Sequence, residues 1–368
     1  MYLILAQKIT NKHNNIFINM VFGIDFLRKK VYNENILLKM SKKQSRYFKL
    51  IKKGWRKMTD SEIELFISKC KIFISFMLHQ QQWSGLTKLE IDNWVANFEP
   101  ANSKEYYYIY KLLTNIIYYS ESDIINALRE GIKDKLFYKE LLNMQVTANF
   151  SLSQQTLSQE YHTNLEKTCF IPLLDSDAPF ESSNYILRLC VQNNFVSTHQ
   201  SIFPNDLLSY VHKNDVKNLV IIDDCVGSGN QLRKFWKFTT ISDGRTLRQF
   251  CKDMNIKAYY LSLFGLKDSI SDLQNEYNDL TIICVKKFAQ TLQVFDDESY
   301  VWDNIQEKNE ALVYFNTFAE NNSFSISGYN NLNLAIIMHR TIPNWSLPMF
   351  WKENSDWKPL MRRKSSNA

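Results

Sequence analysis

The sequence predicts an α/β fold with a parallel sheet, preceded by a helical N-terminal region. Apolar residues recur at helical spacing from residue 59 to about residue 145. After residue 150, short apolar segments typical of strands alternate with helical segments. Strands and helices that alternate along a chain are joined by crossover connections, which produce a parallel sheet. The composition, 45% apolar and 22% charged residues in a chain of 368, is that of a globular protein.

The helical region contains four predicted helices, and we expect no strand within it. The first helix covers residues 59–83, where Thr59 or Asp60 is the expected N-cap. The other helices are predicted at residues 89–98, 105–132 and 133–144.

The sheet is predicted from four strands and the helices between them. The strands are expected at residues 167–174, 216–222, 256–266 and 280–288, and the helices at 182–192, 229–238 and 268–277. Ligands of such sheets bind beyond the carboxyl ends of the strands, near a switch point in strand order. We therefore look for a binding site at the ends of these strands.

Positive charge is concentrated at the N-terminal end. Residues 1–58 contain 14 lysine and arginine residues against 2 acidic ones, whereas the rest of the chain contains 30 against 36. We expect a basic segment at 1–58, a helical region at 59–145 and an α/β domain at 146–363. The basic segment either binds nucleic acid or an acidic partner protein, or is the solvated face of ordinary helices. The third alternative is that the segment precedes the true start, because Met40 opens the more typical sequence MSKKQSRYFKL.

The cysteines and apolar runs indicate neither a secreted nor a membrane protein. The six cysteines form no CxxC pair and have no histidine at metal-ligand spacing, so we expect reduced, buried thiols and no metal site. The longest N-terminal apolar run, residues 16–24, is too short to span a bilayer, and no cleavable signal pattern precedes it. We expect a soluble cytoplasmic protein without a membrane partner.

Two adjacent carboxylates before a glycine turn form the most informative motif. The segment VKNLVIIDDCVGSGNQL places Asp223 and Asp224 after an apolar strand, and the N–H groups from Gly227 to Gln231 at a helix start. Such a turn is suited to a phosphate. It is not a P-loop, since no Gly-Lys-Ser/Thr follows, and Leu232 stands where a dinucleotide fingerprint has its third glycine. The carboxylates suit a ligand with vicinal hydroxyls, such as ribose 5-phosphate.

The segment VIIDDCVGSGNQ resembles the signature with which type I phosphoribosyltransferases bind phosphoribosyl diphosphate (PRPP). The resemblance implies a Rossmann-like parallel sheet in which Asp223 and Asp224 are the catalytic residues that bind the ribose hydroxyls. The residues it implies around the 5-phosphate are Gly227, Ser228, Gly229, Asn230 and Gln231. Asn230 stands where a second glycine is usual and Gln231 where a threonine is usual. The backbone cradle survives those changes, but catalytic competence does not follow from it.

The form DD-x-x-GSG-x-Q is similar to a divergent branch of phosphoribosyltransferase-like proteins of bacterial antiphage and conflict systems, including some retron operons. The segments WVANF, YYSESDI, RTIPNWSLPMFW and WKPLMRR extend the resemblance over roughly residues 85–363. It implies that PRPP or a related phosphorylated ribose binds with Mg²⁺ and that transfer or hydrolysis at ribose C1 serves antiviral defence. One alternative is a catalytically inactive nucleotide-sensing or scaffold subunit of a defence complex. Another is phosphoryl transfer, with Asp223 or Asp224 binding a metal directly.

The loop after the first strand is where the diphosphate group of PRPP is expected. It reads LLDSDAPFESSNYI, in which Ser182 or Ser183 either contacts the diphosphate or caps the next helix. Three lysines follow strand ends and either neutralise phosphate charge or are solvated: Lys267, Lys286 and Lys287.

A hood over the acceptor is expected from the C-terminal segment. His339 and Asn344, together with Tyr329 and Trp345, are candidates for stacking on a base and recognising its edge. The alternative is that this segment packs across the sheet with its tryptophans buried. We also expect a side chain added at Gly229 to intrude on the ligand at no more than the ordinary cost of a loop substitution.

Overall fold

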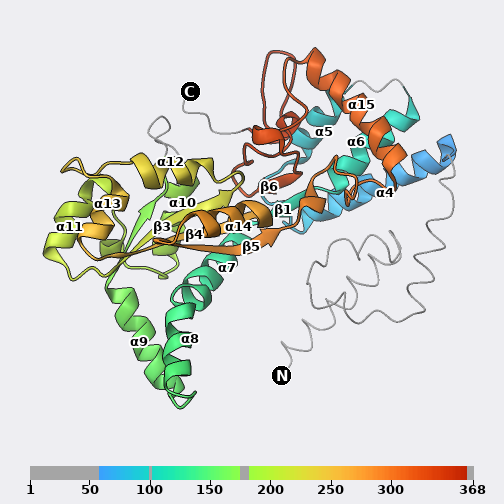
Figure 1. The fold of residues 1–368 in the computed structure, drawn as a ribbon. Coiled ribbons are helices and arrows are strands. Elements are labelled where there is room, and N and C mark those ends of the chain that lie inside the picture. The colour runs from blue at the N-terminus through green and yellow to red at the C-terminus, as the bar shows by residue number, and fades with distance from the viewer. Residues whose placement is uncertain (1–57, 99–101, 175–181, 363–368) are drawn as a thin grey trace.

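The computed structural model describes residues 58–98, 102–174 and 182–362, and the fold below refers to these residues. Figure 1 shows an α/β lobe and a helical lobe side by side. The predicted basic segment at 1–58 lies outside the described residues except for Met58. Its nucleic-acid or protein partner therefore stays a prediction.

Segments from both ends of the chain build the helical lobe (Figure 1). It contains α4 (Asp60–His79), α5 (Lys88–Ala96), α6 (Ser103–Thr114) and α15 (Ile305–Asn321). Thr59 is the N-cap of α4 and forms a capping box with Glu62, which satisfies two backbone N–H groups at the helix start. The core of this lobe includes Trp94 and Phe315, and Trp357 from the C-terminal segment joins them.

The main sheet consists of four parallel strands, as the sequence predicts. They are β2 (Thr168–Pro172), β3 (Asn218–Val226), β4 (Lys257–Leu266) and β5 (Leu280–Phe288), in the order β2-β3-β4-β5. β3 ends at Val226 rather than at Ile222, so Asp223 and Asp224 belong to the strand itself. β3 and β4 are buried along nearly their whole length, because helices cover both faces of the sheet.

A single bridging residue beyond β2 gives the sheet its switch point. Ser201 pairs in parallel with Phe170, and the N–H of Ile202 donates to the carbonyl of Phe170 at 3.0 Å. The chain thus passes outward from β2 to Ser201 and then returns to the other side of β2 to form β3, β4 and β5. Ligands of open α/β sheets bind where strand order reverses in this way. Here that place is the carboxyl edge between β2 and β3.

Different helices cover the two faces of the sheet. One core contains α7 (Glu121–Glu130), the π-helix η2 (Gly131–Lys135) and α10 (Ser182–Gln192). The other contains α11 (Leu207–Lys213), α12 (Asn230–Phe238), α13 (Leu247–Asp253) and α14 (Lys267–Glu276). Along β3, Val220 and Ile222 belong to the first core, whereas Leu219 and Ile221 belong to the second. This is the alternation expected of a strand buried on both faces.

A second, two-stranded parallel sheet lies between the lobes. It pairs β1 (Ile117–Tyr119) with β6 (Ile336–Met338). The expectation of no strand in residues 59–145 is wrong here, because β1 depends on pairing with a segment near the C-terminus that no local pattern reveals. β1 also divides the helix predicted at 105–132. Ile337 packs in the helical lobe, whereas its neighbours in β6 pack against the main sheet.

A helical hairpin projects from the α/β lobe (Figure 1). It consists of α8 (Tyr138–Thr147) and α9 (Gln154–Glu166), and neither helix has a buried residue. Phe137, with φ of 64°, separates α8 from η2, so the helix predicted at 133–144 begins only at Tyr138.

Short 3-10 helices complete the chain: η3 (Thr198–Gln200), η4 (Pro204–Asp206), η5 (Gln290–Leu292), η6 (Tyr329–Asn331) and η7 (Pro348–Phe350).

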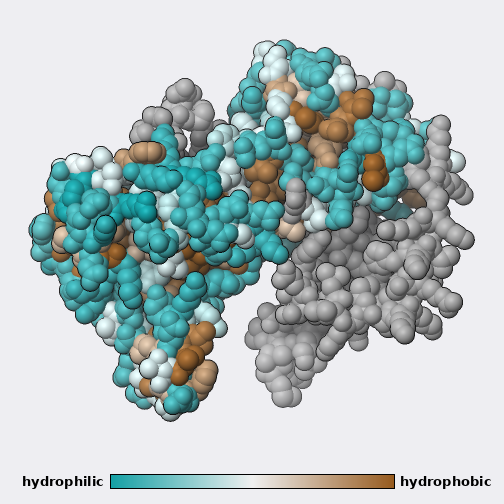
Figure 2. Space-filling model, in the orientation of Figure 1, coloured by the Kyte–Doolittle hydropathy of each residue, from teal (hydrophilic) through white to brown (hydrophobic). Residues whose placement is uncertain are grey.

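The surface and the cysteines can be compared with the predictions of no membrane span and of buried thiols. No helix within the described ranges is long and apolar enough to cross a membrane. Figure 2 shows a largely hydrophilic surface with an apolar patch at the tip of the α8–α9 hairpin, where Val146 and Phe150 are exposed. All six cysteines are free thiols, and all except the half-buried Cys225 are buried, as predicted.

Candidate functional site

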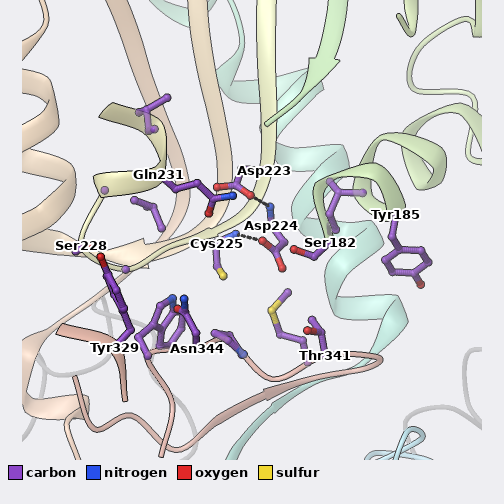
Figure 3. A pocket seen from close by; sticks show the side chains of 18 of the residues that line it. Ser182, Tyr185, Asp223, Asp224, Cys225, Ser228, Gln231, Tyr329, Thr341 and Asn344 are labelled. Carbon is purple, nitrogen blue, oxygen red and sulfur yellow. Dashed lines mark hydrogen bonds between the residues drawn. The ribbon is translucent and has the colours of Figure 1, made fainter. Parts of the chain in front are cut away.

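A cleft of about 1250 Å³ lies at the carboxyl end of β3 (Figure 3). The end of β3 and the loop into α12 line one side of it, α10 lines another, and residues 338–353 of the C-terminal segment lie opposite. Its lining includes every residue of the predicted ribose and phosphate set: Asp223, Asp224, Gly227, Ser228, Gly229, Asn230 and Gln231. The structure therefore brings these residues together at the switch point, while their roles stay predictions.

Two groups of the protein itself donate hydrogen bonds to the carboxyl group of Asp223. Its Oδ1 accepts the N–H of Asp224 at 2.9 Å, and its Oδ2 accepts the hydroxyl of Tyr260 at 2.7 Å. Tyr260 pairs in register with Ile221, which places its side chain on the same face of the sheet as Asp223. Burial and the neighbouring Asp224 raise the pKa of Asp223 well above its ordinary range. Asp223 is thus a buried carboxyl group with two partners inside the protein.

Asp224 lies on the other side of β3, toward Ser182 at the start of α10 (Figure 3). Its Oδ1 accepts the N–H of Cys225 at 2.8 Å. Because adjacent residues of a strand project from opposite faces, the two carboxylates present themselves differently to a ligand. Burial raises the pKa of the Cys225 thiol well above its ordinary range, and the negative charges of Asp224 and Asp223 raise it further. The thiol is therefore neutral at physiological pH.

The loop after β3 leads into the N-terminus of α12. Gly229 is the N-cap, and the first N–H groups of the helix have no carbonyl partner within it. Arg233, one turn further on, donates to the carbonyl of Ser228 at 2.8 Å and to Oδ1 of Asn230 at 3.2 Å. Its Nε also donates to Glu276 on α14 at 2.6 Å. Arg233 therefore holds the loop against the neighbouring helix.

Packing requires two glycines in this loop. A Cβ at Gly227 would lie 2.4 Å from Cδ1 of Trp345, so the indole ring rests directly on the loop. A Cβ at Gly229 would lie 2.9 Å from Cδ1 of Leu273 on α14, and its φ of 77° also disfavours any side chain. A side chain at Gly229 therefore meets Leu273, which the expectation of an ordinary loop cost did not include, while its intrusion on a ligand stays a prediction.

The C-terminal segment lies over the cleft, and three of the four expected residues, Tyr329, Asn344 and Trp345, line it. Asn344 lines the cleft, and its carbonyl accepts the N–H of Tyr329 at 2.8 Å. The hydroxyl of Tyr329, a side chain that is 51% exposed, accepts from Nδ2 of Asn230 at 3.5 Å. Trp345 is buried and also lines the cleft.

His339 lies outside the cleft, which corrects its expected place in the hood. Its Nδ1 hydrogen-bonds the hydroxyl of Ser84 in the helical lobe at 3.1 Å, and burial lowers its pKa. The physical reason is that side chains alternate between the two sides of a strand, and this alternation continues beyond β6. Met338 and Arg340 face the cleft, whereas His339 lies on the same side as Ile337.

Only one of the two serines proposed for the diphosphate lines the cleft. Ser182, the first residue of α10, does so. Ser183 is fully buried, and its hydroxyl donates to the carbonyl of Leu173, which ties the start of α10 to the end of β2. The hydroxyl of Ser183 is therefore engaged within the protein. The loop before them, residues 175–181, lies outside the described residues.

The cations of the cleft differ from those that the sequence suggested. Lys267, Lys286 and Lys287 do not line it, and Lys286 pairs with Glu130 at 2.6 Å. The cleft is lined instead by Arg188 on α10, Lys234 on α12, and Arg340 and Lys352 on the C-terminal segment. These residues come from three separate segments, so only the tertiary structure gathers them. One clue existed, because Arg340 is part of the segment RTIPNWSLPMFW.

Sequence reasoning also missed Tyr260 and Arg233. The register of β3 and β4 identifies Tyr260 once the strands are paired, but pairing is not visible in one sequence. Arg233 follows Gly229 by four residues, a spacing that brings its side chain back toward the helix start. That spacing is the signal with which it could have been found.

The donor groups of the cleft fit Mg²⁺ that arrives with a phosphorylated ligand. Within the described part of the chain, no group of three or more His, Cys, Asp or Glu side chains could hold a metal ion. Mg²⁺ is ordinarily bound by one or two carboxylates together with substrate phosphates rather than by a protein cage. Asp224 supplies such a carboxylate, since Asp223 is already engaged by Tyr260.

Comparison with known proteins agrees with this geometry. The family model described as PRTase-CE, which is of phosphoribosyltransferase type, matches residues 91–363, nearly three quarters of the 368 residues. The matched range includes the whole cleft. No curated protein matches the sequence.

Proposed function

The chain belongs to the PRTase-CE family, and from this membership we propose that its cleft binds PRPP or a related phosphorylated ribose. One observation carries the proposal, the order of groups across the cleft. The N-terminus of α12 suits the 5-phosphate, and Asp224 beside it suits the ribose hydroxyls. Ser182 lies next along the cleft (Figure 3), at the end of the loop that would meet the diphosphate.

In the proposed reaction the C1–O bond of PRPP breaks, and its electron pair leaves with the diphosphate. A base, a nucleic acid, a protein side chain or water then forms the new bond at C1. Positive charge develops on the ribose, so the main catalytic contribution is stabilisation of the departing negative charge. Lys234 and Lys352, which line the cleft, would supply part of this stabilisation. Because the Cys225 thiol is neutral, we propose no covalent intermediate on it.

Mg²⁺ belongs to this proposal as a cofactor that enters with the ligand. Bound, it would neutralise charge on the diphosphate. Asp224 is the residue that would hold it, together with phosphate oxygens of the ligand. The contribution of the chain is to place that carboxylate beside the helix N-terminus.

Separate substitutions of the two carboxylates test the proposal. Calorimetry with ribose 5-phosphate should show that Asp224→Asn weakens binding by about tenfold to a hundredfold, since a hydrogen bond to a charged group contributes about 1.5–3 kcal/mol. Asp223→Asn should weaken it less, because Tyr260 already binds that carboxyl group. Asp272→Asn, an exposed residue of α14, is the control. A wild-type protein that binds neither ribose 5-phosphate nor PRPP at millimolar concentration would refute the proposal.

Binding without chemistry is the second candidate function. It is favoured by the engagement of Asp223 with Tyr260 and by the presence of Asn230 and Gln231 in the loop. The protein would then be a nucleotide-sensing or scaffold subunit. Release of diphosphate from PRPP in the presence of Mg²⁺ distinguishes the two, since a sensing subunit binds the ligand and releases none.

We propose bacterial antiviral defence as the setting of this activity. The support is the resemblance of the loop and its companion segments to the conflict-system branch. Loss of phage protection on Asp224→Asn, in cells that carry the gene with its neighbours, would support this role. Neighbouring genes for purine or pyrimidine synthesis would contradict it.

A further inference from the structure

The cleft has a second end, beyond the groups that the proposed donor uses. Figure 3 shows Ser228, Tyr329 and Asn344 at one end, Asp224 in the middle, and Ser182 followed by Tyr185 at the other. Its volume of about 1250 Å³ exceeds the roughly 300–1,000 Å³ typical of a site for one small molecule. There is room for a second ligand beside the ribose.

Two arginines from different segments lie over one aromatic ring at this second end. The guanidinium carbon of Arg188 lies 5.5 Å from the ring centroid of Tyr185, and that of Arg340 lies 5.4 Å from it. The hydroxyl of Tyr185 donates to Glu121 at 2.7 Å, which fixes the ring. Both arginines are exposed, and neither occurs among the ion pairs found in residues 58–98, 102–174 and 182–362. Two positive charges therefore face the cleft without a carboxylate bound to them.

We propose that Arg188, Arg340 and Tyr185 form a second subsite, which binds a nucleotide through its phosphate and base. An arginine fork binds phosphate through two parallel hydrogen bonds. The planar guanidinium group and the tyrosine ring are also surfaces on which nucleobases stack. A free base would leave the two charges unused, and a simple anion would leave the ring unused. A nucleotide uses both the charges and the ring, because it carries a phosphate and a base. A mononucleotide and the phosphorylated end of a polynucleotide share this chemistry.

This inference rests on the proposed function, in which the nucleotide is the acceptor. A nitrogen or oxygen atom of the nucleotide forms the bond to ribose C1, the C1–O bond of PRPP breaks, diphosphate carries away the electron pair, and the displaced proton passes to water. We assign the two arginines to the acceptor rather than to the diphosphate because both lie over Tyr185, beyond Ser182 along the cleft (Figure 3). Arg188 lies about 9 Å along the axis of α10 from Ser182, at 1.5 Å per residue.

The test measures nucleotide binding to the full chain in the presence of saturating ribose 5-phosphate. The probes are AMP and a short 5′-phosphorylated single-stranded oligonucleotide, which distinguish the two sources of the nucleotide. Arg188→Gln with Arg340→Gln should weaken binding of at least one probe by about tenfold to a hundredfold or more, with ribose 5-phosphate affinity unchanged. The matched control is Arg129→Gln with Lys133→Gln. These two exposed cations also lie over one ring, Phe195, at 5.7 and 6.0 Å, but outside the cleft.

The outcomes separate this inference from the proposed function. Failure of ribose 5-phosphate to bind the wild type overturns both. If ribose 5-phosphate binds but neither nucleotide does, only the second subsite is overturned. It is likewise overturned if the arginine variant and the control variant bind nucleotides equally well. A variant that loses affinity for inorganic diphosphate while keeping nucleotide affinity would assign the arginines to the leaving group instead.

Discussion

Replacing Gly229 with alanine tests whether packing against α14 determines the geometry of the phosphate loop. The added Cβ would lie 2.9 Å from Cδ1 and 3.1 Å from Cγ of Leu273, in a residue with φ of 77°. The left-handed conformation costs a non-glycine residue about 1–2 kcal/mol, and overpacking adds about 1–3 kcal/mol. We expect Gly229→Ala to lower the free energy of unfolding by about 2–5 kcal/mol. Urea denaturation followed by circular dichroism measures this change.

Gly244 provides the matched control, because it has φ of 85° but no atom within 4 Å of an added Cβ. Gly244→Ala should therefore cost only the backbone term, about 1–2 kcal/mol. A double-mutant cycle with Leu273→Ala isolates the contact: Gly229→Ala should cost less in the truncated background. Equal losses for the two glycine variants, or a fully additive cycle, would refute the conclusion that Leu273 determines the loop geometry.

Three further perturbations address the site and the fold. Asp223→Asn should stabilise the ligand-free protein relative to the wild type, and by more as the pH rises. In the folded wild type the pKa of Asp223 is raised, so the wild type loses stability as the pH rises above the unfolded pKa of about 3.9. A melting-temperature difference that stays constant between pH 4 and 8 would contradict this. Arg233→Ala should weaken ribose 5-phosphate binding by about twofold to tenfold through loss of the loop hydrogen bonds. Lys237→Ala, which removes contacts with Glu276 and Tyr277 rather than with the loop, should not. Glu307→Gln should lower the free energy of unfolding by about 1.5–3 kcal/mol, because Lys111 loses the charged acceptor Oε1 of Glu307 at 2.6 Å but keeps its ion pair with Asp303 at 2.9 Å. Calorimetry should show unchanged ligand affinity.

Local patterns in the sequence determined the strands of the main sheet, the helix after β3 and the place of the carboxylates. A strand buried on both faces is a continuous apolar run, and a glycine turn before a helix is a short-range signal. For that reason the boundaries of β2, β4 and β5, and the join from Asp223 to Gln231, could be predicted from one chain.

Contacts between distant segments decided the rest, and they depend on strand pairing that one sequence does not display. The register of β3 with β4 brings Tyr260 to Asp223 and thereby makes the two carboxylates unlike. The pairing of β1 with β6 fixes which side chains after Met338 face the cleft, which excludes His339 and admits Arg340. The tertiary structure also decides whether a glycine is needed for a ligand or for a neighbouring side chain. Leu273 lies beside Gly229 only because α14 packs against the start of α12.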